Sequence, residues 1–547
     1  MDATCEMKLQ LFSNQYYEFV DGFAKSGFDN KKILGKFYTD ENIAKRMISE
    51  MLDKCQHLII RDCIRIIDPF AGDGRLIKLF LEEIDKRQLF ENRNLKVFLW
   101  DIDSEALEKA KKSLVELSKK ISISIDFIFN KTDAFVVYRE KIGYFDICIT
   151  NPPWGLLKPQ KIIGNRYTED EIEKYKKSIA LYDDYMKEEF ALSQPTRKFG
   201  KWGTNLGRTG TEVAMRLLAS DGVCGFVSPA SLFNDQVSIP LRKWIFNNYK
   251  ICNISYYPAE LKLFDSADVS SITVVACGGK TEDPFTIKLF KNVSEYELVD
   301  MSKEEFDYIK RNQYALPLEC GFDTVSILQK FEKLPTLVEY CSYNGMFFTR
   351  ELDETKLADK LFHDGNIIFA KGYMVDRYSF HSDYLFLDET RVIAPNTIKL
   401  WKIVWRDVSR NTQSRRMRAT IIEPNHIAGN SLGILCIEKE SDLVKLRCIL
   451  GIMNSYTFEF QARNQLVSNH VPTGIIKQQH IPINPVSEEL DNLVQRQLDG
   501  ENLINEIDVV VAKMFGLDEN EYLTMLNQYD IDAEERLRLI DLFKLKE

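Results

Sequence analysis

The chain has 547 residues, of which 45% are hydrophobic and 28% charged, values ordinary for a globular protein that exclude intrinsic disorder. At roughly 100–200 residues per domain, this length predicts two or three domains. The formal net charge is −10, but residues 486–547 alone carry 16 acidic and 6 basic side chains. The remainder is therefore neutral overall and can still hold a basic surface.

Neither a membrane span nor a secretion signal is expected. No apolar run approaches the roughly 20 residues that cross a bilayer, and residues 1–6 lack a signal peptide's basic start. The 11 cysteines include no CxxC pair and the six histidines do not cluster, so we expect no metal site and no disulfide framework. These features predict a cytoplasmic protein.

The first half of the chain alternates strand-like and helix-like segments. After a helical lead-in at 1–35, a helix capped by Thr39 or Asp40 places Ile43, Met47 and Met51 on one face. We then expect strands at 63–67, 97–100, 123–129, 145–150, 223–227 and 269–277, and helices at 75–86, 104–117 and 206–219. This alternation predicts a parallel, doubly wound α/β sheet of Rossmann type over residues 36–285.

Other segments break this rhythm. Residues 155–205 are polar and predict a long loop, either functional or disordered. After about residue 300, short β-rich runs alternate with Gly and Asn, which predicts a second, mixed domain at 300–485. Residues 486–547 predict an acidic helical C-terminal segment whose role stays open.

A glycine turn follows the first strand, in the sequence Asp68-Pro69-Phe70-Ala71-Gly72-Asp73-Gly74. Gly72 and Gly74 allow a sharp turn and a close backbone approach to a ligand. A dinucleotide fingerprint needs a third small residue where Ile77 stands, which disfavours NAD. Asp68 would repel a pyrophosphate but suits a cationic amino group, in the crevice where such sheets bind ligands.

Two further strands also end in acid. Asp101, before Ile102, is placed to bind a ribose diol, and Asp133, before Ala134, to accept from an adenine amino group. Together these carboxylates predict an adenosine-bearing cofactor with an ammonium end and no phosphate, which is S-adenosylmethionine. Any one acid alone could instead cap a turn or a helix.

The most specific signal is Asn151-Pro152-Pro153-Trp154, which an apolar strand enters directly. The prolines fix the loop, so that the Asn151 amide oxygen and the Pro152 carbonyl can accept both hydrogens of an exocyclic amine. Two acceptors favour a tetrahedral nitrogen whose lone pair can attack a methyl group, by positioning and electrostatic stabilisation. Trp154 can stack on the heterocycle.

These segments resemble motifs I to IV of the amino-methyltransferases, and Gly35-Lys36-Phe37-Tyr38-Thr39 resembles their motif X. With motif X first and the target domain last, the order is similar to that of the gamma-type, TaqI-like N6-adenine DNA methyltransferases of type II restriction–modification systems. Asn205-Leu206 resembles motif V, residues 222–229 motif VI and residues 263–275 motif VIII.

The resemblance implies a prokaryotic enzyme that transfers a methyl group to an adenine flipped out of duplex DNA. It places Tyr38 and Thr39 at the cofactor and Phe264 against the flipped base, although core packing explains Phe264 equally well. We expect a monomer whose partners are double-stranded DNA and a separate cognate restriction endonuclease, because no segment before motif X has room for a nuclease.

Residues 402–418 form the strongest basic cluster, with six basic side chains and one acid. Such side chains suit guanine edges, adenine edges and phosphates of duplex DNA, although a solvated charged face would look the same. The predicted DNA-binding residues are Lys402, Arg406, Arg410, Gln413, Arg415, Arg416 and Arg418.

Three alternatives stay open at this stage. The chain could methylate RNA adenines, or it could be a non-catalytic DNA-recognition subunit built on a methyltransferase scaffold. An N4-cytosine target is also compatible, because its amino group needs the same two acceptors.

Overall fold

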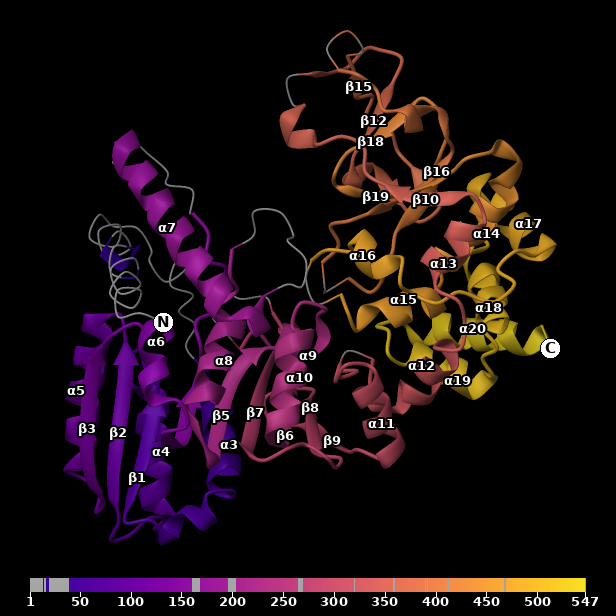
Figure 1. The fold of residues 1–547 in the computed structure, drawn as a ribbon. Coiled ribbons are helices and arrows are strands. Elements are labelled where there is room, and N and C mark those ends of the chain that lie inside the picture. The colour runs from indigo at the N-terminus through magenta and orange to yellow at the C-terminus, as the bar shows by residue number, and fades with distance from the viewer. Residues whose placement is uncertain are drawn as a thin grey trace. The chain divides into compact units, whose positions relative to one another are not determined.

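The computed structural model describes residues 13, 16–18, 39–159, 168–194, 203–263, 269–318, 320–357, 360–388, 390, 392–410, 413–466 and 469–546. The chain divides into two compact units, Met1–Leu316 and Pro317–Glu547 (Figure 1). Most of the predicted helical lead-in at 1–35 lies outside the described residues. Among those described, no helix combines the length and apolar composition needed to cross a bilayer.

A nine-stranded sheet organises the first unit, in the order β3-β2-β1-β4-β5-β7-β6-β8-β9. Its strands are β1 Cys63–Asp68, β2 Asn94–Asp101, β3 Ser124–Lys131, β4 Phe145–Thr150, β5 Leu218–Pro229, β6 Tyr249–Tyr257, β7 Ser271–Gly278, β8 Thr286–Phe290 and β9 Tyr296–Asp300. The strand order reverses between β1 and β4. In an open α/β sheet, such a reversal opens a ligand-binding crevice at the carboxyl ends of the two strands.

The predicted α/β fold is confirmed, but the sheet is mixed rather than wholly parallel. Strands β3, β2, β1, β4 and β5 run parallel, whereas β7 lies antiparallel between β5 and β6. Strand β6 is absent from the predicted elements. Antiparallel β7 follows β6 through a short connection and needs no crossover helix, so strand–helix alternation cannot reveal its direction.

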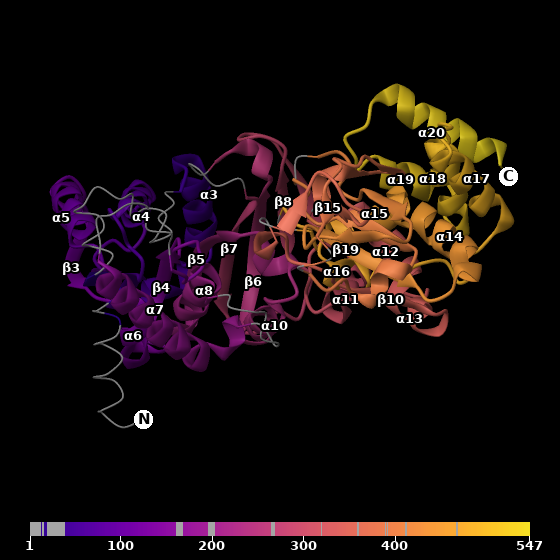
Figure 2. The ribbon, with the colours of Figure 1, turned by 90° about the horizontal axis from the view of Figure 1, so that it is seen from above.

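Helices cover both faces of this sheet, as Figure 2 shows. Helices α3 Glu41–Leu52, α4 Arg75–Lys86 and α5 Ser104–Ser118 cover one face, and α6 Ala134–Val137, α7 Glu169–Glu189, α8 Leu206–Leu217 and α10 Ile239–Asn248 the other. The short α9 Ser231–Asn234 follows β5, and α11 Lys303–Arg311 follows β9. The Asp40 side chain caps α3, as predicted, by accepting from the N–H groups of Asn42 and Ile43.

The polar stretch at 155–205 contains a helix that the sequence pattern did not reveal. Helix α7 begins at a capping box in which Thr168 and Glu171 satisfy each other's backbone N–H groups. Its buried side chains include Tyr175, Ile179, Tyr182 and Met186, which follow helical spacing. Because this face is built largely of tyrosines among many charged residues, it lacks a conventional aliphatic stripe.

The second unit combines two small sheets, a hairpin and a set of helices. One sheet has the order β10-β19-β16-β17, the other β11-β15-β12-β18, and β13 pairs with β14. The strands are β10 Met346–Thr349, β11 Leu361–Phe362, β12 Ile368–Ala370, β13 Val375–Asp376, β14 Ser379–Phe380, β15 Phe386–Leu387, β16 Lys402–Arg406, β17 Ala419–Ile422, β18 His426–Ala428 and β19 Leu432–Ile437.

The helices of this unit share one apolar core with the first of these sheets, from Cys320 to Phe543. They are α12 Val325–Phe331, α13 Leu337–Tyr343, α14 Leu443–Asn454, α15 Tyr456–Arg463, α16 Thr473–Ile476, α17 Glu488–Leu498, α18 Ile504–Met514, α19 Glu519–Leu526 and α20 Ala533–Leu545. The acidic residues after 486 thus belong to helices whose apolar faces are buried in the core.

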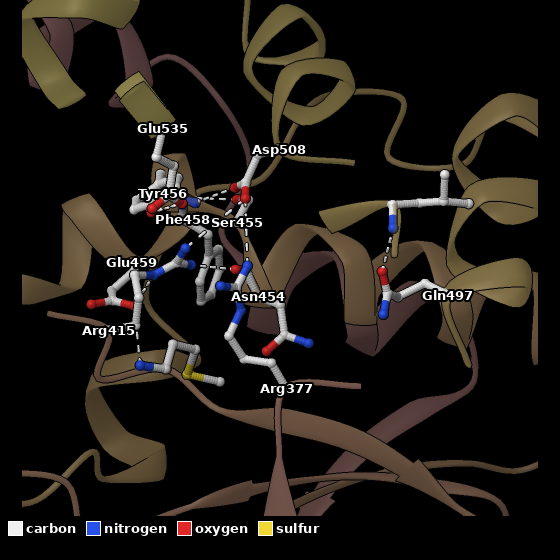
Figure 3. A network of polar contacts seen from close by, with 12 residues as sticks. Arg377, Arg415, Asn454, Ser455, Tyr456, Phe458, Glu459, Gln497, Asp508 and Glu535 are labelled. Atoms are coloured by element: carbon white, nitrogen blue, oxygen red, sulfur yellow. Dashed lines mark hydrogen bonds and ion pairs between the residues drawn. The ribbon is translucent and has the colours of Figure 1, made fainter. Parts of the chain in front are cut away.

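A buried ionic network ties these C-terminal helices to the β region (Figure 3). The Arg415 guanidinium donates to Glu459 on α15 at 3.0 Å and lies 3.9 Å from the Tyr456 ring centroid. Asp508 on α18 faces both Arg415 and Arg377, at 3.9 and 3.4 Å. Burial opposes ionisation of Glu459, but the positive charge of Arg415 lowers its pKa, so this pair stays charged inside the core. At Asp508 burial outweighs the same attraction and raises the pKa.

Replacing Glu459 with Gln is expected to destabilise the second unit by about 3–5 kcal/mol, because Arg415 would keep a buried charge without its closest counter-ion. Urea unfolding followed by circular dichroism measures this change. Glu501→Gln is the control, since it breaks the exposed Arg496–Glu501 pair and should change little. Equal effects of the two substitutions would contradict this account of the network.

Candidate functional site

A cavity opens at the carboxyl ends of β1 to β4. The first residues after these strands, and a few from distant segments, form its lining. Predicted cofactor residues that line it are Thr39, Asp68, Pro69, Phe70, Ala71, Gly72, Asp101, Ile102, Asp133, Ala134 and Asn151. The structure thus brings together side chains that lie up to 112 residues apart in the sequence.

The turn after β1 forms the floor of this cavity. Gly72 and Gly74 both adopt positive φ, +53° and +75°, which favours glycine. A Cβ atom at Gly74 would lie 2.9 Å from the Cβ of Ala110, so this residue lets α4 approach α5 closely. Gly74 is absent from the cavity lining. Its close neighbour is Ala110, so Gly74 serves the packing of the turn against α5.

Asp68 is 1% exposed and joins the two central strands of the site. One carboxylate oxygen accepts from the Thr150 hydroxyl at 2.8 Å and from the Phe70 N–H at 3.1 Å. Burial raises the pKa of this carboxyl to about 7, although both hydrogen bonds favour its ionised form. A cationic group in the cavity would favour ionisation of Asp68 further.

Asp101 and Asp133 are both held by backbone N–H groups. The Asp101 carboxylate accepts from the N–H of Gly72 at 2.7 Å and of Asp103 at 2.8 Å. Asp133 is 4% exposed and accepts from the N–H of Phe135 at 3.0 Å. Burial raises the pKa of Asp133. These bonds fix the orientations of both carboxylates at the cavity wall.

The loop after β4 forms one rim of the cavity. The Asn151 amide nitrogen donates to the Thr39 hydroxyl at 3.1 Å, which orients the amide. Pro153 also lines the cavity. A Cβ atom at Gly210 would lie 2.6 Å from Cβ of Pro152, so helix α8 packs closely behind the loop.

Trp154 is only 6% exposed and packs with the apolar core of the first unit. It is absent from the cavity lining, so its stacking on a substrate ring stays a prediction. Tyr38 and Phe264 lie outside the described residues.

Sequence reasoning missed several lining residues, among them Tyr16, Tyr17, Arg75, Thr132, Phe135 and Leu206. Leu206 lies in a segment noted only for its resemblance to motif V. Tyr16 and Tyr17 come from the N-terminal segment, where two consecutive tyrosines were the sequence signal that could have identified them.

Three of the six cations in the predicted basic cluster at 402–418 are buried and form no exposed surface. Lys402 is fully buried, where its ammonium pairs with Glu351 at 2.6 Å. Arg415 and Arg416 are 6% and 3% exposed. The expectation that these three side chains contact DNA fails for this reason: their charges are satisfied inside the fold by distant carboxylates and backbone carbonyls.

The other four predicted DNA-binding residues keep some exposure. Arg406 donates to the carbonyl of Gly372 at 3.0 Å, and Arg418 pairs with Asp376 at 3.1 Å. Gln413 accepts from the Ser409 hydroxyl at 2.7 Å. Arg410 is exposed. Contact with nucleic acid stays a prediction for these side chains.

No protein-family model matches the chain. A segment of 134 residues, 24% of the chain, is 30% identical to the type II methyltransferase M.VspI of Vibrio sp. (strain 343), of which it covers 28%. The chain thus spans less than a third of that relative's length.

Among solved structures, the type IIL restriction–modification enzyme MmeI in complex with DNA is similar over 94% of this chain and 79% of its own, with a TM-score of 0.51 and 12% identity. The type IIG restriction endonuclease BpuSI is similar over 96% of this chain and 68% of its own, with a TM-score of 0.41 and 14% identity. At this identity, the likeness to MmeI establishes a shared fold.

Asp68 should make stability depend on pH. Its pKa is about 7 in the folded chain against an ordinary value of 3.8, so between these values the folded chain holds a proton that the unfolded chain has released. The free energy of unfolding that this group contributes therefore decreases as pH rises from about 4 to 7. Asp68→Asn should remove this decrease.

Urea unfolding at pH 5 and pH 8 measures the effect. The control is Asp62→Asn, whose carboxylate is fully exposed and should leave the pH dependence as in the unmodified chain. If the Asp68→Asn chain kept that same pH dependence, the pKa of Asp68 would not be raised in the folded chain.

Proposed function

We propose that this chain transfers a methyl group from S-adenosylmethionine to the N6 amine of an adenine in duplex DNA. One observation carries the proposal: a single cavity holds the three strand-end carboxylates and has Asn151 of the Asn-Pro-Pro-Trp loop at its rim. The similarity to a type II methyltransferase over 134 residues supports it, as does the fold shared with MmeI.

The residues of the cavity fit S-adenosylmethionine. Asp101 has carboxylate oxygens suited to a ribose diol, and buried Asp68 suits an ammonium group. Carboxylates at successive strand ends would repel a pyrophosphate, which makes a dinucleotide a poorer fit. The cofactor supplies an electrophilic methyl group on a sulfonium.

Asn151 orients and activates the accepting amine. Its amide nitrogen donates to the Thr39 hydroxyl, which orients the amide. We assign to its carbonyl oxygen, together with the Pro152 carbonyl, the hydrogen bonds that the amine donates. With the cofactor bound, these two acceptors would hold the amine with its lone pair toward the methyl group, so that a C–N bond would form as the S–CH₃ bond breaks and the amine proton would pass to solvent. This is catalysis by positioning and electrostatics, and it needs no histidine.

Adenine is the base that the gamma-type resemblance favours, and cytosine N4 offers the same amine chemistry. We assign duplex DNA recognition to the second unit. Exposed Arg410, with Arg406, Arg418 and Gln413, is the part of the predicted basic cluster that stays available for phosphates or base edges.

Asn151→Ala should reduce methyl transfer at least a hundredfold, because the amine loses one of two acceptors that act in the transition state. Transfer of labelled methyl groups to unmethylated plasmid DNA measures this, with modification-sensitive sequencing to identify the base. Cofactor affinity, measured by calorimetry, separates lost transfer from lost cofactor binding. Asn248→Ala, at an exposed asparagine, is the matched control.

Undiminished transfer by the Asn151→Ala chain would refute the assignment of Asn151. Labelling of RNA but not of DNA by the unmodified chain would replace duplex DNA with RNA as the substrate.

Arg410→Ala should weaken duplex binding and reduce the slope of log affinity against log salt by about 1, as expected for one lost phosphate contact. Fluorescence anisotropy between roughly 50 and 200 mM salt measures this slope. Arg496→Ala, at a side chain 47% exposed on α17, is the control. An unchanged slope for Arg410→Ala would remove this residue from the DNA surface.

A further inference from the structure

Helix α7 contributes a buried tyrosine to the edge of the cofactor cavity. In Figure 1, α7 rises from the end of the sheet toward which β2 points. The Tyr182 hydroxyl donates to Asp133 Oδ2 at 2.6 Å, and the Ser13 hydroxyl donates to the same oxygen at 2.6 Å. Tyr182 is fully buried, and Ser13 is 1% exposed.

Donor counting limits what else Asp133 can bind. An ionised carboxylate offers about four acceptor positions, two on each oxygen. The two hydroxyls occupy both positions of Oδ2, and the Phe135 N–H occupies one of Oδ1. An adenine amino group could reach Oδ2 only by displacing a protein hydroxyl. Oδ2 of Asp133 is therefore an anchor for protein groups, and of the four positions only the second one of Oδ1 has no donor among the described residues.

Tyr182 also supports two aromatic residues of the cavity lining. Its ring stacks on Tyr16, with centroids 5.6 Å apart and planes at 24°. Tyr17 meets it edge-on at 6.1 Å. On the far side, Tyr185 stacks on Tyr182 and donates to the carbonyl of Phe135 at 2.9 Å. Tyr16 and Tyr17, named here the aromatic wall, line the cavity beside Asp101, Ile102 and Ala134.

We propose that Tyr182 is a positioning residue of the cofactor site: it is bonded to Asp133 and holds the aromatic wall in place to pack against the adenine ring of the cofactor. Aromatic faces that pack on an adenine ring recognise its π surface and shape. This inference rests on the proposed function, since it assumes an adenosine-bearing ligand.

The test compares the full chain with Tyr182→Phe, which keeps the ring and removes the hydroxyl. Calorimetry would use S-adenosylmethionine and 5′-methylthioadenosine, which has the adenosine end but no amino-acid end. Loss of a hydrogen bond to a charged group should raise both dissociation constants by about tenfold. Equal factors for the two ligands are expected, because the wall contacts only the adenosine end.

A different hydrogen-bond arrangement at Asp133 predicts the opposite change in ligand affinity. If the adenine amino group instead competed with the Tyr182 hydroxyl for Oδ2 of Asp133, removing that hydroxyl would free the oxygen and tighten binding of 5′-methylthioadenosine. Binding that is tighter, or within twofold of the unmodified chain, overturns the proposal. So does a weakening confined to S-adenosylmethionine, which would place the defect at the amino-acid end.

Two controls complete the design. Tyr343→Phe changes a tyrosine that is 88% exposed in the second unit, and it should leave both constants unchanged. If Tyr182→Phe does not unfold cooperatively, Tyr17→Leu replaces it, with the same weakening expected for both ligands. Failure of the unmodified chain to bind S-adenosylmethionine would refute the proposed function itself, whereas equal binding by the unmodified and variant chains refutes only the role of Tyr182.

Discussion

The hydrogen bond from Thr150 to Asp68 is the interaction on which the candidate site depends. It joins the last residues of β1 and β4 at 2.8 Å, at the point where the strand order reverses. The next residue after Thr150 is Asn151, so this bond fixes the distance between the turn after β1 and the residue that we propose as the amine acceptor. Methyl transfer needs its donor and acceptor within about 3–3.5 Å, which leaves little tolerance in that distance. Close packing of α8 against Pro152 holds the loop from behind.

Much of the first unit could be predicted because local signals agree with the tertiary fold. Helix Arg75–Lys86 and strand Phe145–Thr150 match their predicted bounds, since a glycine turn starts the one and two prolines end the other. Helix α7 could not be predicted, because tyrosines and polar side chains interrupt the aliphatic residues of its buried face, within a charged segment. The direction of β7 was hidden because hydrophobic patterning of a buried strand is the same in parallel and antiparallel pairing.

The basic cluster shows a different limit of sequence reasoning. Six cations within 17 residues predict an exposed surface only if no partner is near. Here Glu351 meets Lys402 from 51 residues away, and Glu459 meets Arg415 from 44 residues away. Such partners become visible only once the strands and helices are assembled. The composition of residues 402–418 shows how many cations they carry but not where the side chains lie. Three of the six are buried, and they stabilise the second unit instead of facing solvent.

The contacts of Asp133 also bear on how the chain folds. Its two hydroxyl donors come from residues 120 positions before it and 49 positions after it. Closing loops of this length costs conformational entropy before any contact repays it, and contacts between distant segments form slowly. Strands β1 and β2 pair across 31 residues, from Cys63 to Asn94, and β2 and β3 across 30, from Asn94 to Ser124, so this edge of the sheet can form early. The aromatic wall can form only after α7 has been synthesised and docked, so the ligand pocket is completed late, around a scaffold that already exists.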